Sequence, residues 1–360
     1  VKEVPERTYV SRIEASLHDA DTVYATFANY KQGDFAPYIA VSRDLGRTWS
    51  LISGDLPNRE IVHSLMQDHE DPKLLFAGTE FGLYFTTDEG EHWVRLKGGL
   101  PTIQVRDIDI QRRENDLALG TFGRGFYVLD DYTPLRQVSA QSLGKDTILF
   151  PVRDALLYIE KRSRQGSRGH GFFTADNPPY GALVTYYLKD KLQTLQEQRI
   201  DAEKKARKAE SKPPLPSMAE LREEDEEIEP RIVLTVRDAA GEVVRRITGP
   251  RDKGIHRISW DLRYPATTPT KLEEETDLAP WEQPDRGRLV APGTYSISLG
   301  KLVGGEMVQL AEAQQFEVIA LDLATFAAED HAVVTAFQAK AAELRRAVSG
   351  ALKAASGAED

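Results

Sequence analysis

The sequence has 360 residues, no cysteine and a formal net charge of −11, so it offers neither disulfides nor thiolate chemistry, and its acidic balance argues against a nucleic-acid-binding surface. No apolar run approaches the ~20 residues of a membrane-spanning helix, so we expect no membrane span. The length favours two or three domains. The chain begins at Val1 with no signal-peptide pattern and enters a strand pattern at once, so we expect an N-terminally truncated chain.

Residues 1–136 carry a repeat of short strands. Each unit has a first strand, a polar turn, a second strand and a third strand, which is typical of an all-β protein. The first strands lie at residues 10–13, 62–65 and 105–108, the second at 23–27, 74–78 and 117–120, and the third at 38–41, 82–85 and 126–129. Small sheets arranged around an axis usually close such a repeat, so we expect β-propeller blades over residues 1–136.

A motif, [Ser/Thr]-x-Asp-x-Gly-x-x-Trp, follows the third strand in the first two units, and its aspartates lie 44 positions apart. The Asp can accept hydrogen bonds from the amides of its own turn, the Gly can adopt φ > 0, and the Trp can anchor the turn. These structural roles predict a repeat fold without indicating chemistry. The residues concerned are Asp44, Gly46, Trp49, Asp88, Gly90 and Trp93.

The third unit lacks this motif, since residues 129–134 contain neither Gly nor Trp. Two full units and a partial one cannot close a ring, because propellers need about 4–8 blades. We therefore expect the remaining blades upstream in the full protein, which we favour, or on another chain.

The repeated motif resembles the Asp-box, or BNR repeat, of sialidase-like, xyloglucanase-like and sortilin-like β-propellers. The surrounding residues 34–38, 78–84 and 120–126 resemble large bacterial secreted proteins labelled as BNR-repeat glycosyl hydrolases or sortilin N-terminal-domain proteins. The resemblance implies a periplasmic or secreted location. It is specific for architecture and not for activity.

Downstream of the repeats, we expect a connector over residues 137–180 and an Ig-like β-sandwich over 181–320. Residues 189–230 interrupt the sandwich with a charged helical insertion. Three short motifs resemble the Ig-like module of the flagellar hook-capping protein, namely Gly254-x-His256, Trp260-Asp261 and Pro292-Gly293-x-Tyr295. This resemblance implies that Trp260 is a core residue. Helical periodicity from residue 323 to 355 predicts an amphipathic helix or a helical pair within a C-terminal helical segment, 321–360.

Glycoside hydrolysis would need two carboxylates about 5–10 Å apart. Glu80 follows a strand, where a propeller loop could reach the axis, although a solvated loop acid is the simpler interpretation. Asp130 and Asp131 are better explained as turn residues. Arginines at blade ends could hold an anion, although surface salt bridges are their commoner fate. The candidate ligand-binding residues are Glu80, Arg106, Asp107 and Arg124, and we assign no catalytic residue.

The sequence predicts no metal site and no cofactor. Its histidines show no HxH or HExxH spacing, and no EF-hand word or phosphate-binding loop is present.

Two functions from different classes remain open. The first is a non-catalytic extracytoplasmic binding or scaffold protein that presents a propeller face to a glycan or a peptide, with a sortilin-like peptide receptor as one form. The alternative is a sialidase- or xyloglucanase-like glycoside hydrolase with most of its active site on missing upstream blades.

Overall fold

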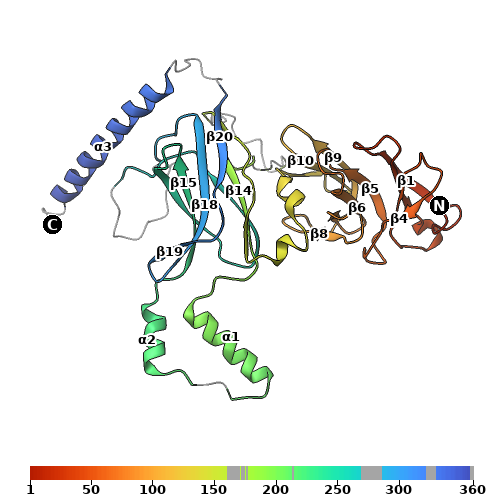
Figure 1. Cartoon of the computed structure of the whole chain (residues 1–360), viewed down its shortest axis with the longest axis horizontal. Coiled ribbons are helices and arrows are strands. Elements are labelled where there is room, and N and C mark those ends of the chain that lie inside the picture. The colour runs from red at the N-terminus through yellow and green to blue at the C-terminus, as the bar shows by residue number, and fades with distance from the viewer. Residues whose placement is uncertain are drawn as a thin grey trace. The chain divides into compact units, whose positions relative to one another are not determined.

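The computed structural model describes residues 1–159, 171, 175, 177–212, 215–268, 286–321 and 330–356 (Figure 1). The protein is mainly β, as expected, and it divides into two compact units, Val1–Ser142 and Leu143–Asp360. Among the described residues, no helix combines the length and the hydropathy that crossing a membrane requires.

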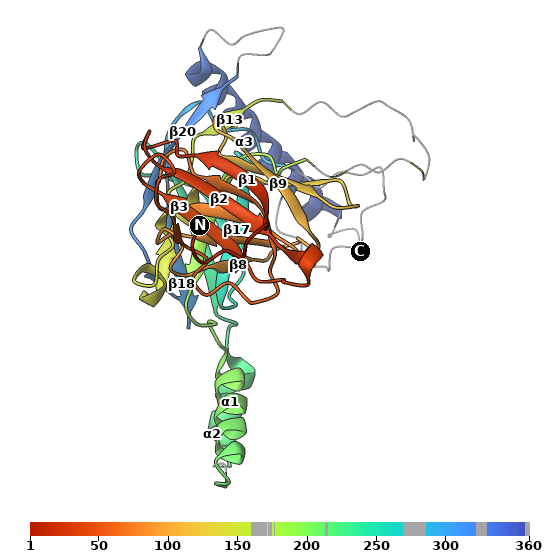
Figure 2. The same ribbon diagram turned by 90° about the vertical axis from the view of Figure 1, so that its right-hand side faces the viewer.

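The first unit contains three antiparallel sheets, in each of which a strand pairs with the next one along the chain. The first sheet comprises β1 (Tyr9–Ala15), β2 (Val23–Ala28), β3 (Tyr38–Ser42) and β4 (Ser50–Leu51), and Figure 2 shows its first three strands side by side. The second sheet comprises β5 (Val62–Gln67), β6 (Leu75–Thr79), β7 (Leu83–Thr86) and β8 (Val94–Leu96). The third sheet has three strands, β9 (Val105–Gln111), β10 (Asp116–Thr121) and β11 (Phe126–Leu129).

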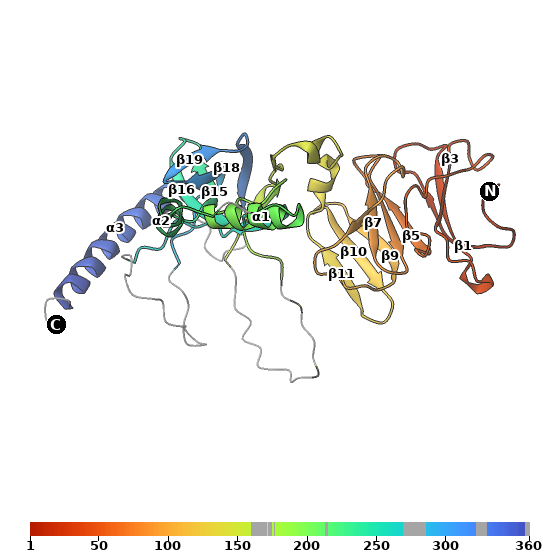
Figure 3. The ribbon, with the colours of Figure 1, turned by 90° about the horizontal axis from the view of Figure 1, so that it is seen from below.

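The sheets lie one behind another, with the second between the other two (Figure 3). Ile39 and Val41 of the first sheet share a hydrophobic cluster with Leu65 and Leu75 of the second. In β9, buried Ile108 and Ile110 alternate with exposed Asp107 and Asp109, the pattern of a strand with one face on a core. Every residue of β7 is buried, because neighbouring sheets cover both faces of the second sheet.

The repeated turns have the hydrogen bonds expected of their sequence. Asp44 Oδ1 accepts bonds from the amides of Arg47 and Thr48, at 3.0 and 2.8 Å, and Gly46 has φ of 83°. Asp88 Oδ1 likewise accepts from the amide of His92, at 2.9 Å, and Gly90 has φ of 97°.

The two tryptophans differ in their anchoring. The Trp49 indole is partly buried and donates to Gly46 O of its own turn at 3.0 Å. The Trp93 indole is buried and donates at 3.0 Å to Ile52 O, in the link between the first and second sheets. The second turn therefore joins two sheets as well as two strands.

After β11 the chain does not form such a turn. Asp131 Oδ1 accepts from the amide and hydroxyl of Thr133, which begins a short 3-10 helix, Thr133–Gln137. Tyr132 is 1% exposed and its hydroxyl donates to Asp68, at the end of β5, so the chain is led back onto the second sheet.

The second unit contains two sheets that share one core. One has the order β12 (Thr147–Leu149), β14 (Ala182–Leu188), β17 (Gly254–Trp260). The other has the order β13 (Ala155–Leu157), β20 (Gln314–Ala320), β18 (Gly293–Val303), β15 (Arg231–Asp238), β16 (Val243–Gly249), with β19 (Glu306–Gln309) also paired to β18. Trp260 is fully buried between them and packs on Tyr295 and Phe316, as expected of a core residue.

The segment expected to be a connector, residues 137–180, contributes two of these strands. β12 pairs with β14, and β13 pairs in parallel with β20. Residues 147–151 and 155–159 have apolar, strand-like sequences, but their partner strands lie far along the chain, so the sequence alone does not assign them to a sheet.

The insertion in the second unit forms two helices, α1 (Leu195–Lys208) and α2 (Met218–Glu226), seen together in Figure 2. Each begins with a capping box, and Arg199 of α1 forms a bidentate ion pair with Glu224 of α2. The C-terminal helix, α3, spans His331–Ser356. Residues 322–329 and 357–360, which the sequence analysis also placed in the C-terminal segment, lie outside the described residues.

Candidate functional site

The first strand of each sheet in the first unit carries one residue more than the neighbouring strand pairs with. These strands are β1, β5 and β9. The β1 register shifts between Val10 and Arg12, so Ser11 is skipped in the backbone pairing with β2, although its hydroxyl lies 2.8 Å from Thr26 Oγ1 on that strand. The β5 register shifts in the same way around His63, and the β9 register around Arg106. A β-bulge re-aims a side chain, so three sheets each direct one polar residue out of the regular alternation.

These bulged residues meet on one face of the unit. One hollow of about 430 Å³ is lined by all three of them, Ser11, His63 and Arg106. Ser11 Oγ also donates to Val62 O at 2.9 Å, which connects the first bulge to the second sheet. We call Ser11, His63 and Arg106, together with Glu80 and Gln104, the bulge site.

The two neighbours of the buried His63 ring indicate which of its nitrogens carries the proton. Its Nε2 lies 3.0 Å from Glu80 Oε2, and its Nδ1 lies 3.4 Å from Arg106 Nη1. Because a guanidinium only donates, Nδ1 must accept and Nε2 must carry the proton. Burial lowers the pKa of His63, and the charge of Arg106 lowers it further, against the opposing effect of Glu80. The ring is therefore neutral near pH 7.

The same contacts hold the Arg106 guanidinium in place. Its Nε donates to Gln104 Oε1 at 3.1 Å, and Gln104 Nε2 in turn donates to Glu80 Oε1. The guanidinium lies over the Phe122 ring, 5.5 Å from its centroid. Its Nη2 has no hydrogen-bond partner among the described residues, which leaves a fixed donor edge for a ligand.

A second hollow, of about 220 Å³, adjoins the first and shares Tyr30, His63 and Arg106 with it. The rim is aromatic, since Tyr30, Phe35 and Phe81 are each 41–43% exposed. It is also basic, because the cationic residues lining the two hollows outnumber the one carboxylate, Glu80; they are Arg7, Lys31, Arg59 and Arg106. An aromatic and basic surface on an acidic chain suits a polar or anionic ligand.

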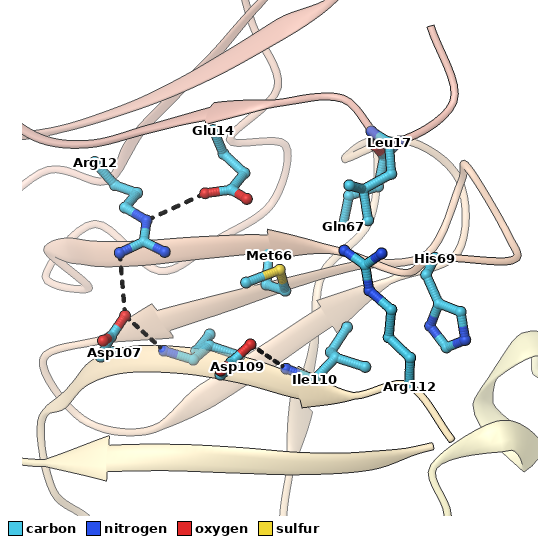
Figure 4. Close-up of a pocket in the computed structure, with 11 residues that line it drawn as sticks. Arg12, Glu14, Leu17, Met66, Gln67, His69, Asp107, Asp109, Ile110 and Arg112 are labelled. Atoms are coloured by element: carbon cyan, nitrogen blue, oxygen red, sulfur yellow. Dashed lines mark hydrogen bonds and ion pairs between the residues drawn. The ribbon is translucent and has the colours of Figure 1, made fainter. Parts of the chain in front are cut away.

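Asp107 lies elsewhere. It lines a separate hollow of about 320 Å³, formed by residues in and next to β1, β5 and β9 (Figure 4). This hollow shares no lining residue with the two hollows of the bulge site. There Arg12 bridges Asp107 and Glu14, at 3.2 Å from each carboxylate. Arg124 is exposed in the β10–β11 turn and lines none of these hollows. The four candidate residues thus separate into one pair, Glu80 and Arg106, and two isolated members.

Three residues of the bulge site were not among the candidates from the sequence, namely Ser11, His63 and Gln104, and neither was Glu60, which supports the site. Glu60 is buried and accepts bonds from Thr79 Oγ1 at 2.7 Å and from the amide of Phe81 at 3.3 Å, so it supports the β6–β7 turn that carries Glu80. The alignment of the three first strands held one signal, because Ser11, His63 and Arg106 occupy its second position.

Among the described residues, one group could offer a metal ion three ligand atoms. Asp88, Glu91 and His92 bring such atoms within 4.8 Å of one another. The Asp88 carboxylate already accepts hydrogen bonds from Thr86 Oγ1 and from the amide and Nδ1 of His92. Both of its oxygens are therefore engaged within the turn.

No protein-family model matches this sequence, and no curated protein matches it. Among solved structures, it matches PorZ, a surface component of the type-IX secretion system of Porphyromonas gingivalis, with a TM-score of 0.28 and 11% identity over 86% of this chain and 30% of that one. It also matches the extracellular domain of the hybrid two-component system BT3049 from B. thetaiotaomicron, with a TM-score of 0.27 and 8% identity over 86% and 32% of the two chains.

A third match is the GH74 xyloglucanase from Xanthomonas campestris, with a TM-score of 0.29 and 15% identity over 49% of this chain and 27% of that one. The chain spans less than one third of the length of each of these three proteins. The fold described above rests on the chain's own strand pairing.

Proposed function

We propose that this chain is part of a non-catalytic, extracytoplasmic binding or scaffold protein, and that the bulge site is the surface it presents to a glycan or a peptide. One observation carries the proposal. Three sheets direct Ser11, His63 and Arg106 to a single face, where Arg106 is held from two sides beside exposed aromatic rings. A fixed guanidinium next to aromatic surface binds polar and anionic groups without any covalent step.

We also propose an architecture for the whole protein. Residues 1–136 are Asp-box blades of a β-propeller, supported by the meander sheets and their repeated turns. The remaining blades come from upstream or from another chain. Residues 181–320 are an Ig-like sandwich with an insertion at 189–230, supported by two sheets with one core. The periplasmic or secreted location follows from the family resemblance.

The arrangement of carboxylates favours binding over glycoside hydrolysis. Both oxygens of Glu80 are engaged, by His63 and Gln104, and Asp107 lines a different hollow. The described residues therefore do not bring these two candidates into one hollow, as hydrolysis with carboxylates about 5–10 Å apart would need.

The test uses the full chain on glycan and peptide arrays, and separately with a panel of soluble polysaccharides. We expect saturable retention on an array and no release of reducing ends. Arg106→Gln should weaken retention by about tenfold or more, because a charged hydrogen bond is worth roughly 1.5–3 kcal/mol. Arg124→Gln, at an exposed arginine outside the site, is the matched control and should bind like the wild type.

Release of reducing ends would instead establish the glycoside hydrolase alternative. Retention that Arg106→Gln and Arg124→Gln leave equally intact would place the ligand away from the bulge site.

A further inference from the structure

The third sheet of the first unit has three strands, one fewer than the first and second sheets. β4 completes the first sheet by pairing with β3, and β8 completes the second by pairing with β7. Within the described residues, β11 pairs with β10 on one side and with no strand on the other. The backbone N–H and C=O groups on that side of β11 therefore form an open edge.

This edge differs from the other two outer edges of the unit. β4 is only two residues long, and β8 carries Arg95 at its centre. Short strands and central charges are the usual means of keeping an edge strand unpaired. β11 has neither feature, because it reads Phe-Tyr-Val-Leu over Phe126–Leu129. An uncharged apolar edge of this length favours pairing with another strand.

The side chains of β11 are uncovered at positions that the second sheet buries. Leu83 pairs with Gly78 and Phe126 pairs with Gly120, so the two residues occupy the same place in the repeat. Leu83 is fully buried, whereas Phe126 is 78% exposed. Two residues further along, Phe85 is 4% exposed and Val128 is 50% exposed. Neighbouring sheets cover both faces of the second sheet, whereas Phe126 and Val128 stand exposed on one face of the third sheet, where an added strand would place its own side chains beside them.

The chain that follows β11 is bonded to the second sheet. Tyr132 and Arg136 are both bonded to Asp68 of the second sheet. Residues 130–136 therefore lead away from the β11 edge instead of turning back along it. A fourth strand for this sheet has to come from another segment.

We propose that β11 is a strand-addition site for an extended segment of another polypeptide, which pairs with it antiparallel. The pairing in the second sheet defines the chemistry of this segment. Val94 and Leu96 of β8 lie opposite Phe85 and Leu83. The incoming strand likewise needs two apolar side chains at alternate positions, opposite Val128 and Phe126. Backbone hydrogen bonds provide affinity in such a complex, and the alternate side chains provide specificity.

The probe is a labelled synthetic peptide with the sequence of residues 91–97, Glu-His-Trp-Val-Arg-Leu-Lys. The full chain is titrated with it, and amide hydrogen exchange is followed with and without the peptide. We expect saturable binding and slower exchange in β11. A peptide with Ser in place of its Val and Leu should not bind.

Phe126→Ser with Val128→Ser should weaken peptide binding by about tenfold or more, since two apolar contacts are lost. Both side chains are exposed, so the fold should survive, and a thermal melt checks this. Ile13→Ser alters a residue of β1 that is 65% exposed, and as the matched control it should bind the peptide normally.

Two results would overturn the proposal. One is a lack of saturable binding, or binding that the β11 variant retains in full. The other is protection of β11 that needs no peptide and grows with protein concentration alongside a dimeric mass, which would make a second copy of this chain the occupant.

Discussion

The guanidinium of Arg136, in the 3-10 helix after β11, donates hydrogen bonds of 2.8 and 2.9 Å to the carboxylate of Asp68, which directly follows β5 and lies 68 positions earlier in the chain. The Asp68 side chain is fully buried, and it also accepts from the Tyr132 hydroxyl at 2.5 Å and from the Asp71 amide at 2.7 Å. These contacts fix the path of the chain after β11, and the open edge of the third sheet follows from that path.

Removing one partner of this pair should be costly. In Arg136→Met, the buried Asp68 carboxylate loses its cation, so we expect the first unit to lose about 3–5 kcal/mol of stability. Adding Asp68→Asn should recover part of the loss, because no buried charge then remains. Hydrogen exchange of β5 and β6 at increasing urea measures both effects. Losses that simply add in the double variant would show that the two side chains are not coupled.

Acid should destabilise the first unit through its bonded aspartates. Burial alone would raise the pKa of Asp68, but hydrogen bonds from Arg136 and Tyr132 outweigh it and lower the pKa below 3.8. In the first repeated turn, hydrogen bonds from Thr48 and Ser42 lower the pKa of Asp44 to about 2.

A carboxylate with a lowered folded pKa stabilises the fold at any pH above its unfolded pKa, and this contribution disappears as the pH falls through the folded pKa. Stability should therefore fall between about pH 4 and pH 2. Melting temperatures across that range provide the measurement, and Asp68→Asn should show a shallower fall than the wild type. An equal slope in both proteins would argue against a role for Asp68.

The two repeated tryptophans should differ in importance. Trp93 is buried between two sheets, so we expect Trp93→Ala to destabilise the first unit by about 3–5 kcal/mol. Trp49 is only partly buried and anchors its own turn, so Trp49→Ala should lose less, about 1–3 kcal/mol. Chemical denaturation of both variants gives the comparison. A larger loss for Trp49→Ala would contradict the different anchoring of the two rings.

The His63 pKa should respond to its two neighbours in opposite directions. Glu80 raises the pKa of the ring and Arg106 lowers it, while burial keeps it below the ordinary value. Glu80→Gln should therefore lower the His63 pKa further, and Arg106→Gln should raise it. A ¹⁵N NMR titration reads both shifts and also the Nε2–H tautomer. Shifts of the same sign in the two variants would mean that the chain of bonds through His63 does not form.

Much of the secondary structure could be predicted from local sequence. The three third strands, the positive φ of Gly46 and Gly90 and the amides bonded to Asp44 all follow from residues within a few positions of one another. β19 was missed, because Glu306–Gln309 is exposed along its length and carries no alternation of buried and exposed residues.

The candidate site could be predicted only in part. Glu80 and Arg106 were found because they lie at strand ends of the repeat. Asp107 was grouped with them as a candidate carboxylate, yet it lines another hollow, because the bulge at Arg106 re-aims that side chain and leaves Asp107 in the regular alternation of β9. His63 shows no metal-ligand spacing, so its only signal is its place in the alignment of the three first strands, where it matches Ser11 and Arg106.

The sequence by itself determined where strands and turns occur, because turn chemistry and apolar alternation act over a few residues. Only the tertiary structure decided which side chains converge. Ser11, His63 and Arg106 lie 52 and 43 positions apart, and each is re-aimed by a bulge that exists only relative to a partner strand. The same holds for the open edge of β11, because Asp68 and Arg136 meet only once the sheets have packed.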